Sequence, residues 1–137
     1  MEALGRVFNV VHSASGVHIP LKDAQAVTFV GFENDGATEI DVVESKGSGV
    51  SETPLATVTR HWVSNGVGGA WTLVEHAATA KVTPADGALD CWLFTVSAAE
   101  LSDGFTHVEA TADGGTCIAI VHDLTVQRDP AKLAALV

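Results

Sequence analysis

Short apolar segments alternate along this chain with clusters of Gly, Asn, Asp and Ser at fairly regular intervals. In most of these segments hydrophobic and polar residues alternate, which is the period of a half-buried β-strand. The segment 26–32 is almost continuously apolar and rich in β-branched and aromatic residues, so it predicts a mostly buried strand. The predicted strands cover residues 4–12, 17–21, 26–32, 38–44, 55–63, 70–76, 91–96, 105–112 and 116–126.

Three turn sequences predict that consecutive strands form hairpins. They are Asn34-Asp-Gly36, the segment 64–69 and Asp113-Gly-Gly115, whose residues tolerate positive φ. Helix signals are almost absent apart from a capping box at Ser97 and Glu100, which predicts a single helical turn between two strands. About eight short strands predict an all-β fold, an antiparallel β-sandwich, with a closed barrel as the competing geometry.

The pattern indicates one domain followed by a short tail. No internal repeat or linker divides the chain, so we expect a β-sandwich domain over 1–127 and a C-terminal docking tail over 128–137. Asp129 and Pro130 suit the cap and first position of a helix over the last seven residues. An isolated helix shorter than about 12 residues is marginal in water, so the tail needs a surface on which to dock.

Composition and charge narrow the possible partners. Asp+Glu 17 against Lys+Arg 7 gives a formal net charge of -10, which disfavours binding to nucleic acid or to anionic membranes. No apolar run approaches the ~20 residues of a membrane helix. No basic region followed by an apolar region, the pattern of a secretory signal peptide, is expected either. Hydrophobic residues reach 47% but charged residues only 18%, below the usual ~25%. This excess predicts apolar surface that other subunits cover, and hence a homo-oligomer.

The histidines and cysteines show no spacing that demands a metal or a disulfide. His61 and His76 can converge across the second hairpin, but a metal there would need a carboxylate such as Glu75. We therefore expect surface or interface histidines, and no metal or cofactor. Without a secretory signal, Cys91 and Cys117 are predicted to be buried thiols rather than a bridge across the sandwich.

Catalytic motifs are missing as well. The segment 47–49 reads Gly-Ser-Gly, but no helix follows it as a hydrolase nucleophile requires. The glycines of segment 66–69 lead into a strand rather than a helix N-terminus, unlike a phosphate-binding turn. The chain is therefore predicted not to be an enzyme.

The tryptophans offer a different kind of site. Trp62, Trp71 and Trp92 can form a sugar-stacking surface, and the first two of them flank the loop 64–69. Packing in the core or across the hairpin is the simpler expectation for such large aromatic residues. The chain also lacks tyrosine, in which recognition surfaces are enriched. A carbohydrate-binding or adhesin-like module is therefore the alternative function.

Five segments carry a family resemblance: Gly5-Arg-Val-Phe8, Ile19-Pro-Leu-Lys-Asp-Ala24, Val27-Thr-Phe-Val-Gly-Phe-Glu-Asn34, Ala99-Glu-Leu-Ser-Asp-Gly104 and His122-Asp-Leu-Thr-Val-Gln-Arg128. They resemble small virion proteins of tailed phages that infect actinobacteria. The likeness covers nearly the whole chain and includes no catalytic signature. It implies a capsid decoration or minor capsid protein that is assembled in the host cytoplasm. Such a protein would bind the major capsid protein in many copies and stabilise the lattice; a tail structural subunit is the alternative within the virion.

The expected contacts with the capsid lie at the two ends of the chain. The contact residues are Arg6, Val7 and Phe8 in the first strand and Arg128, Pro130, Leu133, Leu136 and Val137 in the tail. Full burial of each of the last three side chains contributes about 1.5–3 kcal/mol. Ordering the tail costs about 1–2 kcal/mol per residue, so attachment through several copies at once would help to hold it.

Overall fold

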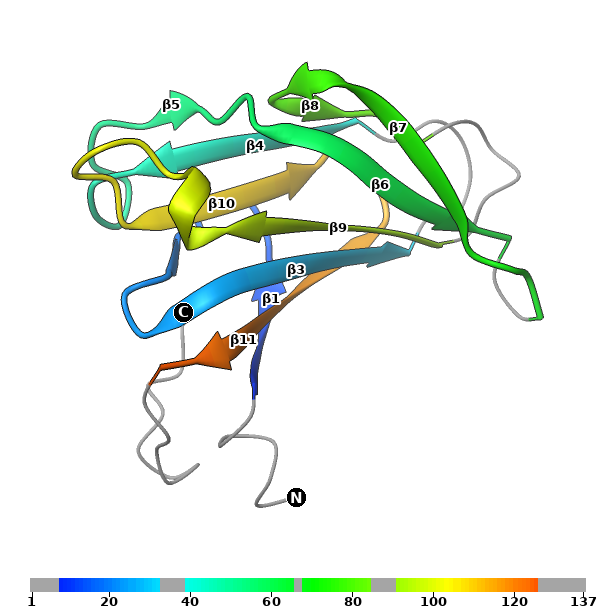
Figure 1. Cartoon of the computed structure of the whole chain (residues 1–137), viewed down its shortest axis with the longest axis horizontal. Coiled ribbons are helices and arrows are strands. Elements are labelled where there is room, and N and C mark those ends of the chain that lie inside the picture. The colour runs from blue at the N-terminus through cyan, green and yellow to red at the C-terminus, as the bar shows by residue number, and fades with distance from the viewer. Residues whose placement is uncertain (1–7, 33–38, 66–67, 85–90, 126–137) are drawn as a thin grey trace.

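The computed structural model describes residues 8–32, 39–65, 68–84 and 91–125, which form two antiparallel sheets packed face to face (Figure 1). The sheets do not close into a barrel, so the predicted all-β sandwich is confirmed. In the described ranges, no helix is both long enough and apolar enough to span a membrane.

The large sheet has six strands and the small sheet has five. The large sheet runs in the order β1 (Phe8–Ser13), β11 (Thr116–Leu124), β3 (Ala24–Phe32), β9 (Cys91–Ser97), β6 (Val58–Ser64) and β7 (Thr72–Thr79). The small sheet contains β2 (Ile19–Pro20), β10 (His107–Ala112), β4 (Ile40–Ser45) and β5 (Thr53–Pro54) in that order, and β8 (Lys81–Val82) also pairs with β4. Each predicted strand corresponds to one of these. The two-residue strands β5 and β8 were not predicted.

Two of the three predicted hairpins are wrong. The loop 64–69 does join the paired strands β6 and β7. However, β3 pairs with β11 and β9 in the large sheet, whereas β4 belongs to the small sheet. The turn Asp113–Gly115 likewise carries the chain from β10 in the small sheet to β11 in the large sheet. Turn residues permit the chain to reverse, but they do not decide whether the next strand pairs alongside or crosses to the other sheet.

The core lies between the inner faces of the two sheets. Its aromatic centre stacks Phe94 between Phe29 and Trp92, with ring centroids 5.3 Å and 5.8 Å apart. Gly31 lies opposite Trp92 in the register of β3 and β9, and a Cβ at Gly31 would lie 2.0 Å from the indole ring. The absence of a side chain at Gly31 is therefore what admits the tryptophan to the core.

The capping box and the cysteines follow the predictions in part. The Ser97 hydroxyl accepts a hydrogen bond from the Ala99 N–H, and Glu100 accepts from the Ser97 N–H, at the start of the short helix η1 (Ala98–Glu100). Both cysteines are thiols, but only Cys117 is fully buried, and burial raises its pKa to about 11. Cys91 and Cys117 also lie in the same sheet, so a bridge across the sandwich is excluded by position.

Candidate functional site

The structure describes only one of the residues predicted to contact the capsid. Phe8 opens β1, is half-buried, and lies opposite His122 near the end of β11. The two segments predicted to dock therefore join the large sheet at the same end. The other predicted contacts lie outside the described residues: Arg6, Val7, Arg128, Pro130, Leu133, Leu136 and Val137.

A continuous apolar surface crosses the outer face of the large sheet. Successive side chains of a strand point to opposite faces of the sheet. In each strand of the large sheet, the residues that alternate with the core residues therefore point away from the small sheet. The strand registers place five such side chains in one line, which we call the outer row: Ile118 of β11, Val30 of β3, Leu93 of β9, Trp62 of β6 and Leu73 of β7. Five neighbouring strands thus each contribute one apolar side chain.

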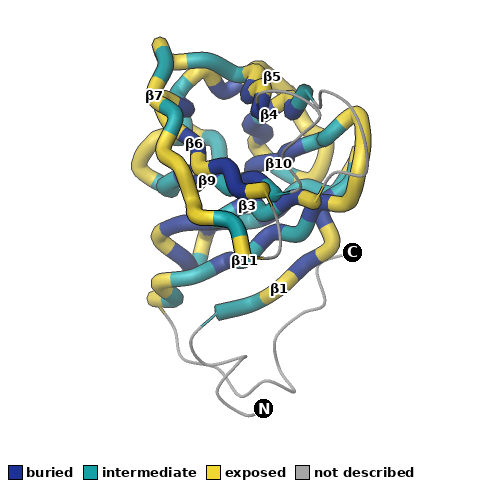
Figure 2. Tube along the Cα trace, turned by 90° about the vertical axis from the view of Figure 1, so that its right-hand side faces the viewer, coloured by how far each residue is buried: buried dark blue, intermediate teal, exposed yellow. Residues whose placement is uncertain are grey.

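The outer row is open to solvent, most of all at its β6–β7 end. Trp62 is 39% exposed and Leu73 is 38% exposed, while the other three members are partly exposed. Figure 2 shows that β7, at the edge of the sheet, is exposed along most of its length. Phe32 (49% exposed) and Val10 (43% exposed) extend the apolar surface on either side of the row. Single exposed apolar residues are common, but a contiguous patch of this kind is a candidate interaction surface.

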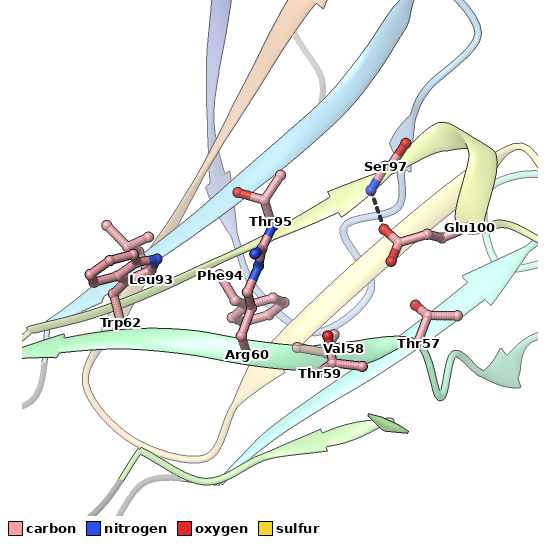
Figure 3. Close-up of a pocket in the computed structure, with 10 residues that line it drawn as sticks. All are labelled: Thr57, Val58, Thr59, Arg60, Trp62, Leu93, Phe94, Thr95, Ser97 and Glu100. Atoms are coloured by element: carbon pink, nitrogen blue, oxygen red, sulfur yellow. Dashed lines mark hydrogen bonds between the residues drawn. The ribbon is translucent and has the colours of Figure 1, made fainter. Parts of the chain in front are cut away.

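A groove opens beside the row where β6 and β9 diverge. The two strands pair only from Trp62 to Ser64, and the register of β6 with its other neighbour, β7, shifts between Val58 and Arg60. The resulting hollow of about 500 Å³ is lined by Thr57, Val58, Thr59, Arg60, Trp62, Leu93, Phe94, Thr95, Ser97 and Glu100. In Figure 3, Arg60 extends from β6 toward Thr95 on β9, with Trp62 at one end of the groove and Glu100 at the other. The groove therefore combines an aromatic face, one cation, one carboxylate and several hydroxyl groups.

The tryptophans divide between the core and the surface. Trp92 is 1% exposed and belongs to the core, as expected for a large aromatic residue. Trp62 lies opposite Leu73 rather than opposite Trp71, so the two tryptophans beside the loop do not form a directly opposed pair. Trp71 is 46% exposed. Of the three tryptophans offered for sugar stacking, Trp92 is therefore excluded by burial, Trp62 and Trp71 are accessible, and only Trp62 lines the groove.

His61 and His76 meet across the hairpin, but His61 is buried in the fold, so the prediction of surface or interface histidines is wrong for this residue. The His61 Nδ1 and His76 Nε2 atoms are 3.1 Å apart, and the ring centroids are 5.1 Å apart. His61 is buried, and this burial, with a smaller effect from His76, lowers the pKa of its imidazole. Glu75 adjoins His76 in β7, so its side chain points to the opposite face of the strand and does not join the two histidines.

A second cluster, which the sequence did not reveal, lies on the outer face of the small sheet. His18 Nε2 lies 2.5 Å from Glu52 Oε1 and 3.0 Å from Glu109 Oε2. Among the residues that the structure describes, these three are the one set of His, Cys, Asp and Glu side chains placed to hold a metal ion together. The three residues are far apart along the chain and follow no short motif, so only the folded sheet brings them together.

Comparison with models of protein families, with curated proteins and with solved structures gives no match to this chain. The features of this chain that bear on its function are therefore the outer row, the groove, the two side-chain clusters and the resemblance of the sequence segments.

Proposed function

We propose that this chain is a structural protein of a phage virion that binds the capsid lattice through the outer row and the two terminal segments. The observation that carries the proposal is the row itself, in which five adjacent strands present apolar side chains to solvent. The partner is the major capsid protein, as the sequence resemblance implies. The protein acts in many copies, in the virion, without catalysis.

The size of this surface explains why the terminal segments are needed. Six strands spaced ~4.8 Å apart span ~24 Å, and six residues along a strand span ~20 Å, so the outer face offers ~500 Å². A stable interface usually buries ~800 Å² on each partner. The contacts predicted at Arg6–Phe8 and in the tail 128–137 would supply the difference, and both segments attach at one end of this sheet.

Charge supports the same assignment. The net charge of -10 keeps the protein from binding the packaged genome, while the apolar row is free of charged side chains and costs little to desolvate. A subunit that covers a protein lattice needs both properties, because it must attach to protein in the presence of a large excess of nucleic acid.

The direct test is co-sedimentation of the purified full-length protein with phage capsids assembled without it. We expect saturable binding and a rise in the temperature at which the capsids disassemble. Deletion of 129–137 should abolish binding, while circular dichroism still reports a folded sandwich. A full-length protein that stays in the supernatant at micromolar concentration, or that leaves capsid stability unchanged, would contradict the proposal. Binding to tail particles instead of capsids would move the assignment to a tail subunit.

The groove between β6 and β9 supports one competing function, carbohydrate binding. Its exposed Trp62, with Arg60 and the nearby hydroxyl groups, resembles the mixture of a stacking face and hydrogen-bonding groups that sugars require. A glycan array probed with the wild type and with Arg60→Ala separates the two functions, because Arg60 lies in the groove and outside the outer row. Glycan binding that Arg60→Ala abolishes would favour the carbohydrate module over the capsid protein.

A further inference from the structure

We propose that His18, Glu52 and Glu109 form a binding site for one divalent transition-metal ion, of which Zn²⁺ is the best match. The site lies on the small sheet and is separate from the outer row, so it does not depend on the proposed docking function.

Local structure brings the three ligands together from separate parts of the chain. His18 precedes β2, and continuing the antiparallel register of β2 and β10 places it opposite Glu109. Glu52 ends the tight loop between β4 and β5, in which Gly49 (φ 71°) and Ser51 (φ 55°) adopt left-handed backbone conformations. The Glu52 carboxylate at the end of this loop reaches His18, which lies 34 positions earlier in the chain.

The spacing of the ligand atoms suits a tetrahedral ion. Zinc–ligand distances of about 2.0–2.2 Å in a tetrahedral site place the ligand atoms about 3.3–3.6 Å apart. Here His18 Nε2 lies 2.5 Å from Glu52 Oε1 and 3.0 Å from Glu109 Oε2, and all three ligand atoms lie within 4.8 Å of one another. Admitting an ion requires Glu52 to move outward by about 1 Å. Its side chain is 49% exposed and has room to do so.

The other two ligands are held in place by hydrogen bonds outside the ligand set. His18 Nδ1 lies 3.2 Å from the Gly16 carbonyl oxygen, and donating a hydrogen bond there leaves the Nε2 lone pair facing the carboxylates. Glu109 Oε1 accepts hydrogen bonds from the Gly16 N–H and the Thr111 hydroxyl, which leaves Oε2 facing His18. The side chains of His18 and Glu109 are only 4% and 8% exposed. Two of the three ligands are therefore oriented before any ion arrives.

The donor set points to the class of ion. Imidazole nitrogen favours Zn²⁺ and its neighbours over Mg²⁺ and Ca²⁺, while two carboxylates are compatible with all of these ions. The ion would coordinate the Nε2 lone pair of His18, while the Nδ1 side of the ring faces the Gly16 carbonyl oxygen. The bound ion would tie the edge strand β2, the strand β10 and the loop before β5 to one another.

The test is isothermal titration calorimetry of the untagged, metal-stripped full-length protein with Zn²⁺, and with Mg²⁺ for comparison. We expect one Zn²⁺ per chain, no measurable Mg²⁺ binding, and a Tm higher by about 5–10 °C at a hundredfold excess of Zn²⁺ over its dissociation constant. Glu52→Gln keeps the size of a half-exposed side chain and should weaken Zn²⁺ binding at least about tenfold.

His76→Ala is the matched control, because it removes a histidine from the other histidine cluster and should leave Zn²⁺ affinity unchanged. His18→Ala should abolish Zn²⁺ binding, and circular dichroism checks that this variant is folded. If His18→Ala does not fold, the Zn²⁺ affinity of Glu52→Gln tests the proposal instead. Absence of stoichiometric Zn²⁺ binding would overturn the proposal and leave the cluster as an ion-pair network. Binding that His76→Ala removes and Glu52→Gln leaves unchanged would overturn it too.

Discussion

Truncating Trp62 is the sharpest test of the outer row as a docking surface. Trp62 is 39% exposed. A tryptophan has roughly 250 Å² of surface, so docking could bury ~100 Å² of this ring in addition to what the fold already covers. At ~25 cal/mol per Å², that area contributes ~2.5 kcal/mol to binding. Trp62→Ala should therefore weaken capsid binding by up to about 60-fold.

The same substitution also affects the fold, and the assay has to separate the two effects. The covered part of the ring packs against Leu73 and Leu93 on the neighbouring strands. Losing this packing should cost about 2–4 kcal/mol, which most domains tolerate because their stability is about 5–15 kcal/mol. Binding isotherms should therefore be measured by co-sedimentation at a temperature where circular dichroism shows that the wild type and Trp62→Ala are both fully folded.

Val50→Ser is the control for this experiment. Val50 is 54% exposed and lies in the loop between β4 and β5, away from the outer row, so its loss should leave capsid binding unchanged. A folded Trp62→Ala protein that binds within threefold of the wild type would refute the reasoning. An equal loss of affinity in Val50→Ser would refute it as well, because the effect would then not be specific to the row.

Three further predictions concern stability and reactivity. Gly31→Ala should lower the free energy of unfolding by about 3 kcal/mol or more, measured by urea denaturation, because the new Cβ would lie 2.0 Å from the fully buried Trp92 ring; an unchanged midpoint would contradict this packing. His61 has a lowered pKa in the folded state, so the unfolded chain binds its proton more strongly. Its contribution to stability should be complete above its ordinary pKa of 6.5 and decline as the pH falls below it. Thermal melts across this range should show a shallower decline for His61→Gln, and equal slopes would contradict the assignment. Cys117, with a pKa of about 11, should resist iodoacetamide at neutral pH until the protein unfolds, and rapid labelling of the folded protein would count against its burial.

The positions of the strands were largely predictable, because they depend on local patterns. The predicted strand 26–32 corresponds to β3 (Ala24–Phe32), and the capping box marked the short helix η1 (Ala98–Glu100). Side-chain alternation, turn residues and helix caps all act within a few residues of one another, so they can be read directly. The apolar excess also predicted exposed apolar surface, although it did not indicate which strands would carry it.

The assignment of strands to sheets was not predictable in the same way. The turn Asp113–Gly115 has the residues of a hairpin, yet it joins strands in different sheets. Whether β10 pairs with β11 or with β4 depends on how much apolar surface each arrangement buries across the whole domain. The free energy of burying this surface depends on residues far apart in the chain. The residues of the turn therefore do not reveal which pairing is favoured.

The candidate sites show the same division between local and long-range effects. Trp62 was identifiable as a candidate recognition residue because it flanks a loop, but its alignment with Leu93 and Val30 exists only in the strand register. His18 and Glu109 each appear unremarkable along the chain and meet only because β2 pairs with β10. Local sequence thus specified which residues form strands and turns, since those preferences act over a few bonds. The outer row and the cluster of His18, Glu52 and Glu109 form only when distant strands pair. Which strands pair depends on how much apolar surface the whole core buries.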